Sequence, residues 1–150
     1  MMSQKSKLAL KLLGGAEVRL NGRLLTFASS KALALLAYLA LSEESHGRTE
    51  IAALLWPESD EKSGRNALRY TLSVLQKEIG KEWLVTSRKT LALPHDDHGR
   101  LTVDVLTFQQ YALSDGEDDW RTAVSLYQGH FMAGFTLRDA LPFDDWQRAT

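Results

Sequence analysis

Seven polar side chains recur on one side of the segment 60–79, and their chemistry suits contacts to a nucleic acid. They are Lys62, Arg65, Asn66, Arg69, Tyr70, Ser73 and Lys77. Arginine can grip guanine and asparagine can grip adenine through two hydrogen bonds, whereas lysine mostly neutralises phosphate. Arg65, Asn66 and Arg69 are therefore the leading candidates for contacts to base edges. An ordinary solvated helix surface carries similar residues, so the pattern by itself leaves both interpretations open.

Two further groups of polar residues precede segments where helices are expected to begin. Ser29, Ser30 and Lys31 form the first group, and Arg48 and Thr49 form the second. A helix N-terminus exposes unpaired backbone N–H groups and the positive end of the helix dipole, which favour a phosphate. We therefore expect both groups to contact the DNA backbone rather than to read sequence.

A third basic group is the pair Arg88 and Lys89, which lies between two expected strands, 83–87 and 90–93. The pattern predicts a hairpin with a cationic tip, which suits a narrow, A·T-rich minor groove. Charged residues also protect exposed hairpins from edge-to-edge association. An ordinary solvated turn is therefore the alternative.

Motifs for metal binding or catalysis are weak in this chain. Residues 95–98, His-Asp-Asp-His, have metal-ligand types, but they fall in a polar turn and are expected to be a solvated loop. Gly14-Gly15 lacks the spacing of a phosphate-binding loop, and no G-x-S-x-G nucleophile elbow occurs. No nucleophile, base and orienting residue are brought together by sequence logic. We expect neither an enzyme nor a cofactor.

The composition is that of an ordinary globular protein with an uneven charge distribution. The chain has 150 residues and no cysteine, which excludes disulfides and thiolate metal sites and fits a cytoplasmic location. Its longest apolar run, 32–41, is far shorter than the roughly 20 residues that cross a bilayer. Residues 1–90 hold 14 Lys and Arg against 9 Asp and Glu, whereas residues 91–150 hold 4 against 10. This split favours a polyanion-binding part joined to an acidic part.

The residues before the basic groups predict a small antiparallel sheet and a buried helix. The strands are expected at 8–13, 16–20 and 24–27. Asn21-Gly22 is typical of a two-residue hairpin turn. Ser29 or Ser30 is expected to cap a helix over 31–42, whose Ala and Leu residues cover nearly the whole circumference and so require deep burial.

Two helices and the basic hairpin are expected next. Thr49 is predicted to cap a short helix that ends at Trp56, and Ser59 or Asp60 opens a longer one that Gly80 ends. The longer helix has an apolar stripe opposite its polar face, formed by Leu68, Leu72, Leu75 and Ile79. Strands, three helices and a hairpin are the winged-helix order, in which the second helix of the helix-turn-helix pair enters the major groove. Further helices are expected at 103–113 and 120–131.

Several sequence blocks resemble those of the SARP-type bacterial transcriptional activators. The most specific block contains Leu54-Leu55-Trp56-Pro57-Glu58-Ser59-Asp60, Arg65-Asn66-Ala67-Leu68-Arg69 and Leu72-Ser73-Val74-Leu75. Segments 12–22 and 31–32 are similar to the same family, as are 103–105, 126–135 and 143–146. The resemblance implies an α+β fold: an OmpR-like winged helix-turn-helix with an N-terminal antiparallel sheet and a C-terminal hairpin wing, followed by tetratricopeptide-like helices.

The resemblance also implies a domain division. Residues 1–97 correspond to the DNA-binding domain, and residues 98–150 correspond to the truncated start of a helical bacterial transcriptional activation domain. A tetratricopeptide-like array needs roughly three repeats to bury its faces. We therefore expect Phe143 and Trp146 to lack neighbours unless further chain or a partner covers them.

The function implied by the family is sequence-specific binding to promoter DNA, through recognition helix 60–79 and wing 83–93. Implied partners are double-stranded DNA and RNA polymerase, with a homodimer or tandem binding on direct repeats, and no membrane. The alternative is a protein interaction module of a larger signalling regulator without direct DNA readout. The salt dependence of DNA affinity distinguishes the two, because phosphate neutralisation makes log K fall linearly with log salt.

Overall fold

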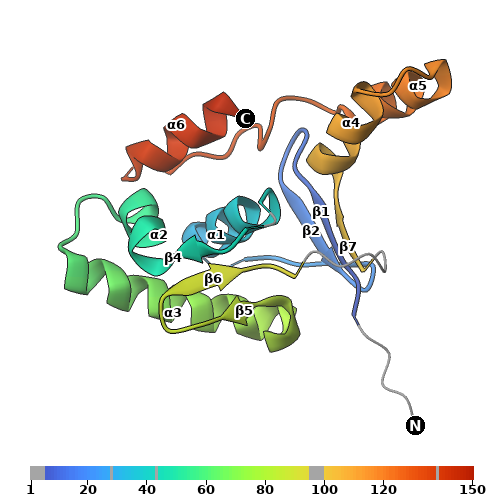
Figure 1. The fold of residues 1–150 in the computed structure, drawn as a ribbon. Coiled ribbons are helices and arrows are strands. Elements are labelled where there is room, and N and C mark those ends of the chain that lie inside the picture. The colour runs from blue at the N-terminus through green and yellow to red at the C-terminus, as the bar shows by residue number, and fades with distance from the viewer. Residues whose placement is uncertain (1–5, 28, 43, 95–99, 138) are drawn as a thin grey trace, which may run out of the picture. The chain divides into compact units, whose positions relative to one another are not determined.

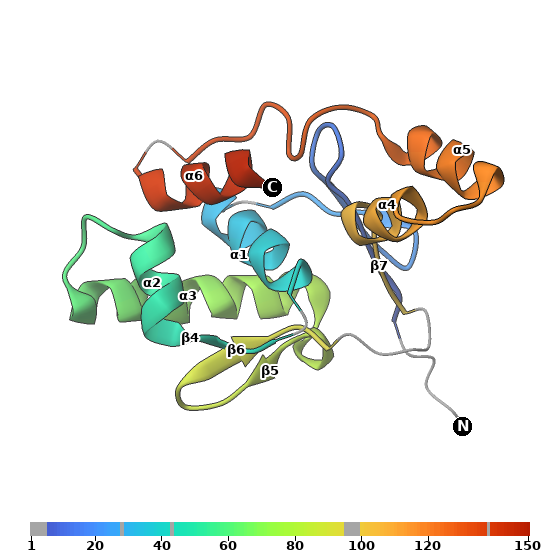
Figure 2. The same cartoon turned by 45° about the horizontal axis from the view of Figure 1, so that its top comes forward.

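The computed structural model describes residues 6–27, 29–42, 44–94, 100–137 and 139–150 as a mixed α+β structure (Figures 1 and 2). The chain forms two compact units, each made of two segments. Unit 1 contains Met1–Leu25 and Asp96–Phe135, and unit 2 contains Thr26–His95 and Thr136–Thr150. All the residues expected to contact DNA fall in unit 2.

Unit 1 is built on a four-stranded sheet in the order β3-β2-β1-β7. Its strands are β1 (Leu8–Lys11), β2 (Glu17–Leu20), β3 (Arg23–Leu24) and β7 (Leu101–Val103). The first three are antiparallel neighbours, as the sequence predicts. Asn21 and Gly22 both have positive φ, 54° and 83°, which confirms the predicted two-residue hairpin turn. The unpredicted β7 pairs with β1 in parallel.

Two helices complete unit 1, α4 (Asp104–Ala112) and α5 (Glu117–Leu126). Asp104 is buried, and its carboxylate accepts hydrogen bonds from the backbone N–H groups of Leu12 and Leu13 at 2.7 and 2.9 Å. This contact fixes the start of α4 to the end of β1. The helix expected at 120–131 begins earlier and ends earlier, because the acidic residues 117–119 occupy its first turn, where the helix dipole favours them.

Unit 2 combines a small sheet with the longest helices of the described chain. The sheet has the order β4-β6-β5, with β4 (His46–Gly47), β5 (Val85–Thr86) and β6 (Thr90–Ala92) all antiparallel. The helices are α1 (Ser30–Ala40), α2 (Arg48–Leu55), α3 (Glu61–Ile79), the 3-10 turn η1 (Lys81–Trp83) and α6 (Leu141–Ala149). In both ribbon views α1 lies between α3 and α6.

The core of unit 2 follows the predicted patterns closely. Seven of the eleven residues of α1 are 0% exposed, as its nearly continuous apolar circumference requires. The stripe of Leu68, Leu72, Leu75 and Ile79 on α3 is buried and faces the same core. Gly80 ends α3 with a φ of 97°, a conformation that favours glycine.

Three local expectations need correction. Residues 83–87 begin as a 3-10 turn, and only Val85–Thr86 is strand. The N-cap of α2 is Gly47 and not Thr49, because Gly47 already belongs to β4 and the helix starts at Arg48. Phe143 and Trp146 do have neighbours: Phe143 is fully buried, and the Trp146 ring lies 5.0 Å from that of Tyr38 on α1.

The compact units also differ from the sequence-based division at residues 97 and 98. The strand β7 comes from the expected second domain but pairs with β1, and α6 comes from the same domain but packs against α2. Both contacts join segments far apart in sequence, which local patterns do not reveal. The functional domain boundary itself stays a prediction.

Candidate nucleic-acid interface

The candidate interface rests on the packing of α2 against α3 in unit 2. Gly64 on α3 faces Ala52 on α2, where a Cβ at position 64 would lie 3.5 Å from the Cβ of Ala52, so the two helices approach closely. Asp60 caps α3, as the sequence predicts, and its carboxylate accepts a 2.7 Å hydrogen bond from the N–H of Ser63. That hydrogen bond lowers the pKa of Asp60 from its ordinary value of 3.8. The cap fixes where the polar face of α3 begins.

All seven predicted residues of α3 are exposed to solvent. They are Lys62, Arg65, Asn66, Arg69, Tyr70, Ser73 and Lys77. Tyr70 is 72% exposed, which is unusual for so large a ring and leaves its face available for a partner. The opposite side of the helix is the buried stripe, so the two faces predicted from the sequence are separated in the structure.

Six polar residues from three elements converge on one hollow of about 400 Å³. The polar residues are Arg48 from α2, Lys62, Arg65, Asn66 and Arg69 from α3, and Arg88 from the turn between β5 and β6, with Leu68 completing the lining. No Asp or Glu belongs to this described lining. Five cationic side chains and one amide without a carboxylate make a site that attracts anions.

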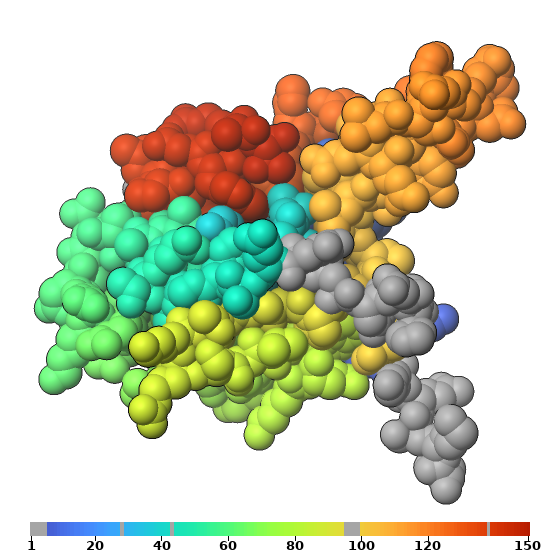
Figure 3. Space-filling view, in the orientation of Figure 1, coloured from blue at the N-terminus to red at the C-terminus, as the bar shows by residue number. Residues whose placement is uncertain are grey.

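The β5–β6 hairpin carries the basic pair at its turn, and the turn projects from the surface of the unit (Figure 3). Arg88 and Lys89 are both exposed. Ser87 closes the turn, because its hydroxyl oxygen accepts hydrogen bonds from the N–H groups of Lys89 and Thr90 at 3.2 and 2.9 Å. The carbonyl of Thr90 also accepts a 3.0 Å hydrogen bond from the N–H of Ser87.

Arg48 connects the start of α2 to this turn. Its backbone N–H donates to the carbonyl of Lys89 at 2.8 Å, and its Nε–H donates to the carbonyl of Ser87 at 3.0 Å. Sequence reasoning missed the part played by Ser87. A serine immediately before a basic hairpin tip is typical of a turn closed by its hydroxyl, and this is the signal that was available.

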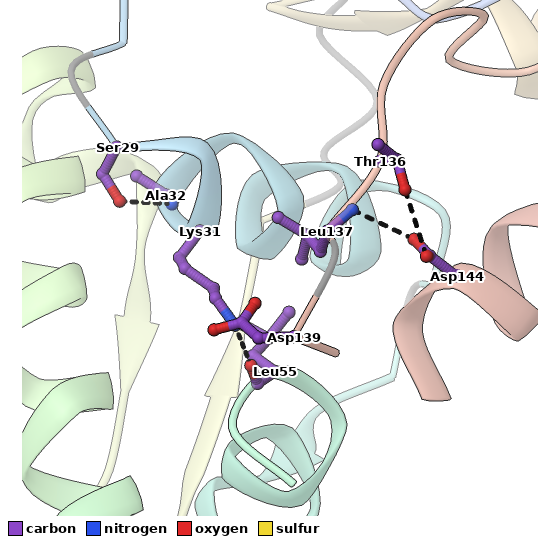
Figure 4. Close-up of polar contacts among 8 residues, drawn as sticks. All are labelled: Ser29, Lys31, Ala32, Leu55, Thr136, Leu137, Asp139 and Asp144. Atoms are coloured by element: carbon purple, nitrogen blue, oxygen red, sulfur yellow. Dashed lines mark hydrogen bonds and ion pairs between the residues drawn. The ribbon is translucent and has the colours of Figure 1, made fainter. Parts of the chain in front are cut away.

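The residues at the start of α1 are placed differently from Arg48. Ser29 is the predicted N-cap, and its hydroxyl accepts a 3.2 Å hydrogen bond from the N–H of Ala32 (Figure 4). Ser30 is exposed at the first position of α1, and Thr49 is exposed at the second position of α2. None of these three lines the basic hollow.

Lys31 is directed into the protein and does not join the basic face. Its ammonium donates to the carbonyl of Leu55 and lies 3.1 Å from Oδ1 of Asp139 (Figure 4). The same ammonium stands 5.3 Å from the centre of the Trp56 ring. The Lys31 side chain is only 16% exposed. The Lys31 charge is already used within unit 2, which argues against the phosphate contact expected there, and that contact stays a prediction.

Two other features of the sequence lead to no described site. Residues 95–98 lie outside the described residues, so the expectation of a solvated loop there stays a prediction. Within the described ranges, no group of three or more His, Asp or Glu residues is arranged to hold a metal ion. None of the described helices is both long enough and apolar enough to cross a membrane.

Comparison with known proteins identifies the fold. No family model matches the sequence, and no curated protein matches it significantly. The structure is similar to that of Mycobacterium tuberculosis EmbR, solved in complex with a low-affinity phosphopeptide, with a TM-score of 0.75 at 19% identity. The match covers 97% of this chain and 42% of that one. The two chains therefore share a fold, and the expectation of a mixed α+β architecture is confirmed.

Proposed function

We propose that this chain is a sequence-specific DNA-binding transcriptional regulator, most simply an activator. Helix α3 enters the major groove as the recognition helix, and the β5–β6 hairpin acts as the wing. The observation that carries the proposal is the hollow lined by Arg48, Lys62, Arg65, Asn66, Arg69 and Arg88 without a carboxylate. A DNA phosphate strand passing between helix and hairpin fits this arrangement of charge.

The position of each residue on α3 indicates whether it contacts a base edge or a phosphate. Arg65, Asn66 and Arg69 lie in the N-terminal half of the helix, where helix-turn-helix proteins contact base edges. Tyr70 and Ser73 follow one turn later and extend the readout, with the exposed Tyr70 ring suited to a thymine methyl group. Lys62 and Lys77 lie near the two ends and neutralise phosphates.

The remaining parts of the proposal rest on the resemblance to SARP-type activators and on the fold shared with EmbR. They are recruitment of RNA polymerase, binding to direct repeats as a homodimer or in tandem, a tetratricopeptide-like continuation after the winged helix, and a cytoplasmic location. No enzymatic activity and no cofactor form part of the proposal.

A protein interaction module is the second candidate, and one observation favours it. Leu113, Trp120, Val124 and Tyr127 in unit 1 are all between 47% and 87% exposed, although they are large and apolar. Trp120 and Val124 lie on α5 with Tyr127 directly after it, at the spacing of one helix face, whereas Leu113 follows α4. Exposed apolar groups on one face commonly mark contact with another protein surface. Under this alternative, the basic residues of α3 only solvate the surface.

Footprinting on genomic fragments, followed by titration of a protected fragment at several salt concentrations, tests the proposal. We expect discrete protected sites and a linear fall of log K with log salt, whose slope reflects the phosphates neutralised. A matched fragment without a protected site should bind more weakly at every salt concentration. Absence of protection together with weak, salt-insensitive binding would favour the protein interaction module.

A further inference from the structure

Arg48 is part of α2 and also contacts the turn of the β5–β6 hairpin. It is the first residue of α2 and lines the basic hollow, but its Nε–H and its backbone N–H are both engaged by the hairpin turn, at the carbonyls of Ser87 and Lys89. These two bonds bracket Arg88, because the accepting carbonyls belong to the residues on either side of it. The turn is therefore held against the start of α2 at the point where Arg88 leaves the backbone.

This attachment determines where the charge of Arg88 lies. The hairpin has only two residues in β5 and three in β6, so its own ladder constrains the turn weakly. The Ser87 hydroxyl fixes the turn internally, but it does not fix the turn relative to α3. Among the described hydrogen bonds, those from Arg48 tie the turn to the helical part of the unit, and Arg88 then lines the same hollow as Arg65 and Arg69.

We infer that Arg48 is a positioning residue that fastens the hairpin turn to α2, so that Arg88 and the α3 arginines present one continuous cationic site to DNA. The inference rests on the proposed function and adds a role for Arg48 beyond a phosphate contact at a helix start. Lysine cannot replace arginine here, because the Nε–H donor lies on the rigid, planar guanidinium fork and the ammonium lacks this geometry.

A double-mutant cycle separates positioning from direct contact. Arg48→Ala in the otherwise wild-type chain should weaken binding to the protected fragment on the order of tenfold, but less than about twofold when Arg88 is already alanine. The matched control pairs Lys77→Ala with Arg88→Ala, because Lys77 is exposed on α3 outside the hollow. The factors by which Lys77→Ala and Arg88→Ala each weaken DNA binding should multiply in this control double mutant. Equal effects of Arg48→Ala in both backgrounds would overturn the inference.

The conservative variant Arg48→Lys adds a second criterion. Arg48→Lys keeps the positive charge. If Arg48 only contacts a phosphate, this variant should bind DNA nearly as tightly as wild type, with an unchanged slope of log K against log salt. The positioning role predicts instead that Arg48→Lys loses most of the affinity that Arg48→Ala loses, in a protein with unchanged circular dichroism. Full recovery of affinity by lysine would contradict the inference.

Amide hydrogen exchange tests the attachment without DNA, so its failure can be distinguished from failure of the proposed function. In free Arg48→Ala protein, the amides of Ser87, Lys89 and Thr90 should exchange several-fold faster, while those in the middle of α3 keep their wild-type rates. Arg48→Ala keeps the backbone N–H bond to Lys89 and removes the Nε–H bond to Ser87. Unchanged exchange at the turn would therefore refute attachment through the side chain, even if the wild-type chain binds DNA. Faster exchange in a chain that binds no DNA would refute the proposed function and the positioning role, while leaving the attachment established.

Discussion

The ammonium of Lys31, at the start of α1, lies 3.1 Å from Oδ1 of Asp139 in the segment that leads into α6. The same ammonium donates to the carbonyl of Leu55 and so satisfies an acceptor at the C-terminal end of α2. One side chain thus joins α1, the end of α2 and the approach to α6 inside unit 2. Lys31 therefore has a structural role, which the residues next to it in the sequence do not indicate.

Lys31→Ala should therefore lower stability and leave DNA binding nearly unchanged. The loss should be roughly 1 kcal/mol, because a charged donor to a half-buried carbonyl is removed. Asp139→Ala should cost less, since Asp139 is 67% exposed and exposed ion pairs contribute little. Chemical denaturation gives the free energies, and the salt slope of DNA binding should match wild type. If the slope of log K against log salt is shallower by about one in Lys31→Ala, Lys31 does contact a phosphate.

Trp146 is half-buried and should contribute to the stability of unit 2. Its ring lies 5.0 Å from that of Tyr38 on α1, which attaches α6 to α1, and 5.2 Å from that of Phe143 on α6 itself. Trp146→Ala should lower the free energy of unfolding by about 2 kcal/mol. Trp120→Ala is the matched control, because Trp120 is 51% exposed on α5 and should cost clearly less. Equal losses would mean that α6 does not pack as described.

The Asp60 cap predicts an acid-sensitive contribution to stability. Its pKa is lowered by the hydrogen bond from the Ser63 N–H, so the folded state favours the carboxylate. This contribution is present above the ordinary value of 3.8 and is lost as pH falls through the lower value of the folded state. Asp60→Asn keeps a capping oxygen that does not titrate. Wild type should lose stability relative to Asp60→Asn below about pH 4, and parallel curves would contradict the assignment.

The basic hairpin tip predicts a preference for the sequence flanking the main site. A narrow A·T-rich minor groove has an enhanced negative potential that attracts arginine. Arg88→Ala combined with Lys89→Ala should therefore lower affinity more for a site with A·T-rich flanks than for the same core with G·C-rich flanks. The melting temperature should change little, since both side chains are exposed. Equal losses on the two duplexes would leave the tip without a role in flank preference.

Local patterns predicted much of unit 2, whereas contacts between distant segments were beyond them. The stripe of Leu68 and Leu75, the Asp60 cap and the Asn21-Gly22 turn depend on residues within a few positions of each other, where periodicity and turn chemistry are informative. The pairing of β7 with β1 and the packing of α6 involve partners more than 90 residues apart. The site shows the same contrast: exposure of the α3 face follows from periodicity, but the direction of Lys31 depends on Asp139.

Readout of the DNA sequence by α3 is tested by comparing specific with nonspecific binding. Wild type, Asn66→Ala and Arg69→Ala are titrated at one salt concentration against a footprinted fragment and a scrambled duplex of equal length. If α3 reads the sequence, each variant should lose about 1–3 kcal/mol, roughly 5- to 150-fold, on the footprinted fragment and much less on the scrambled duplex. If both variants remain folded and keep the wild-type ratio of specific to nonspecific affinity, α3 is not the reader.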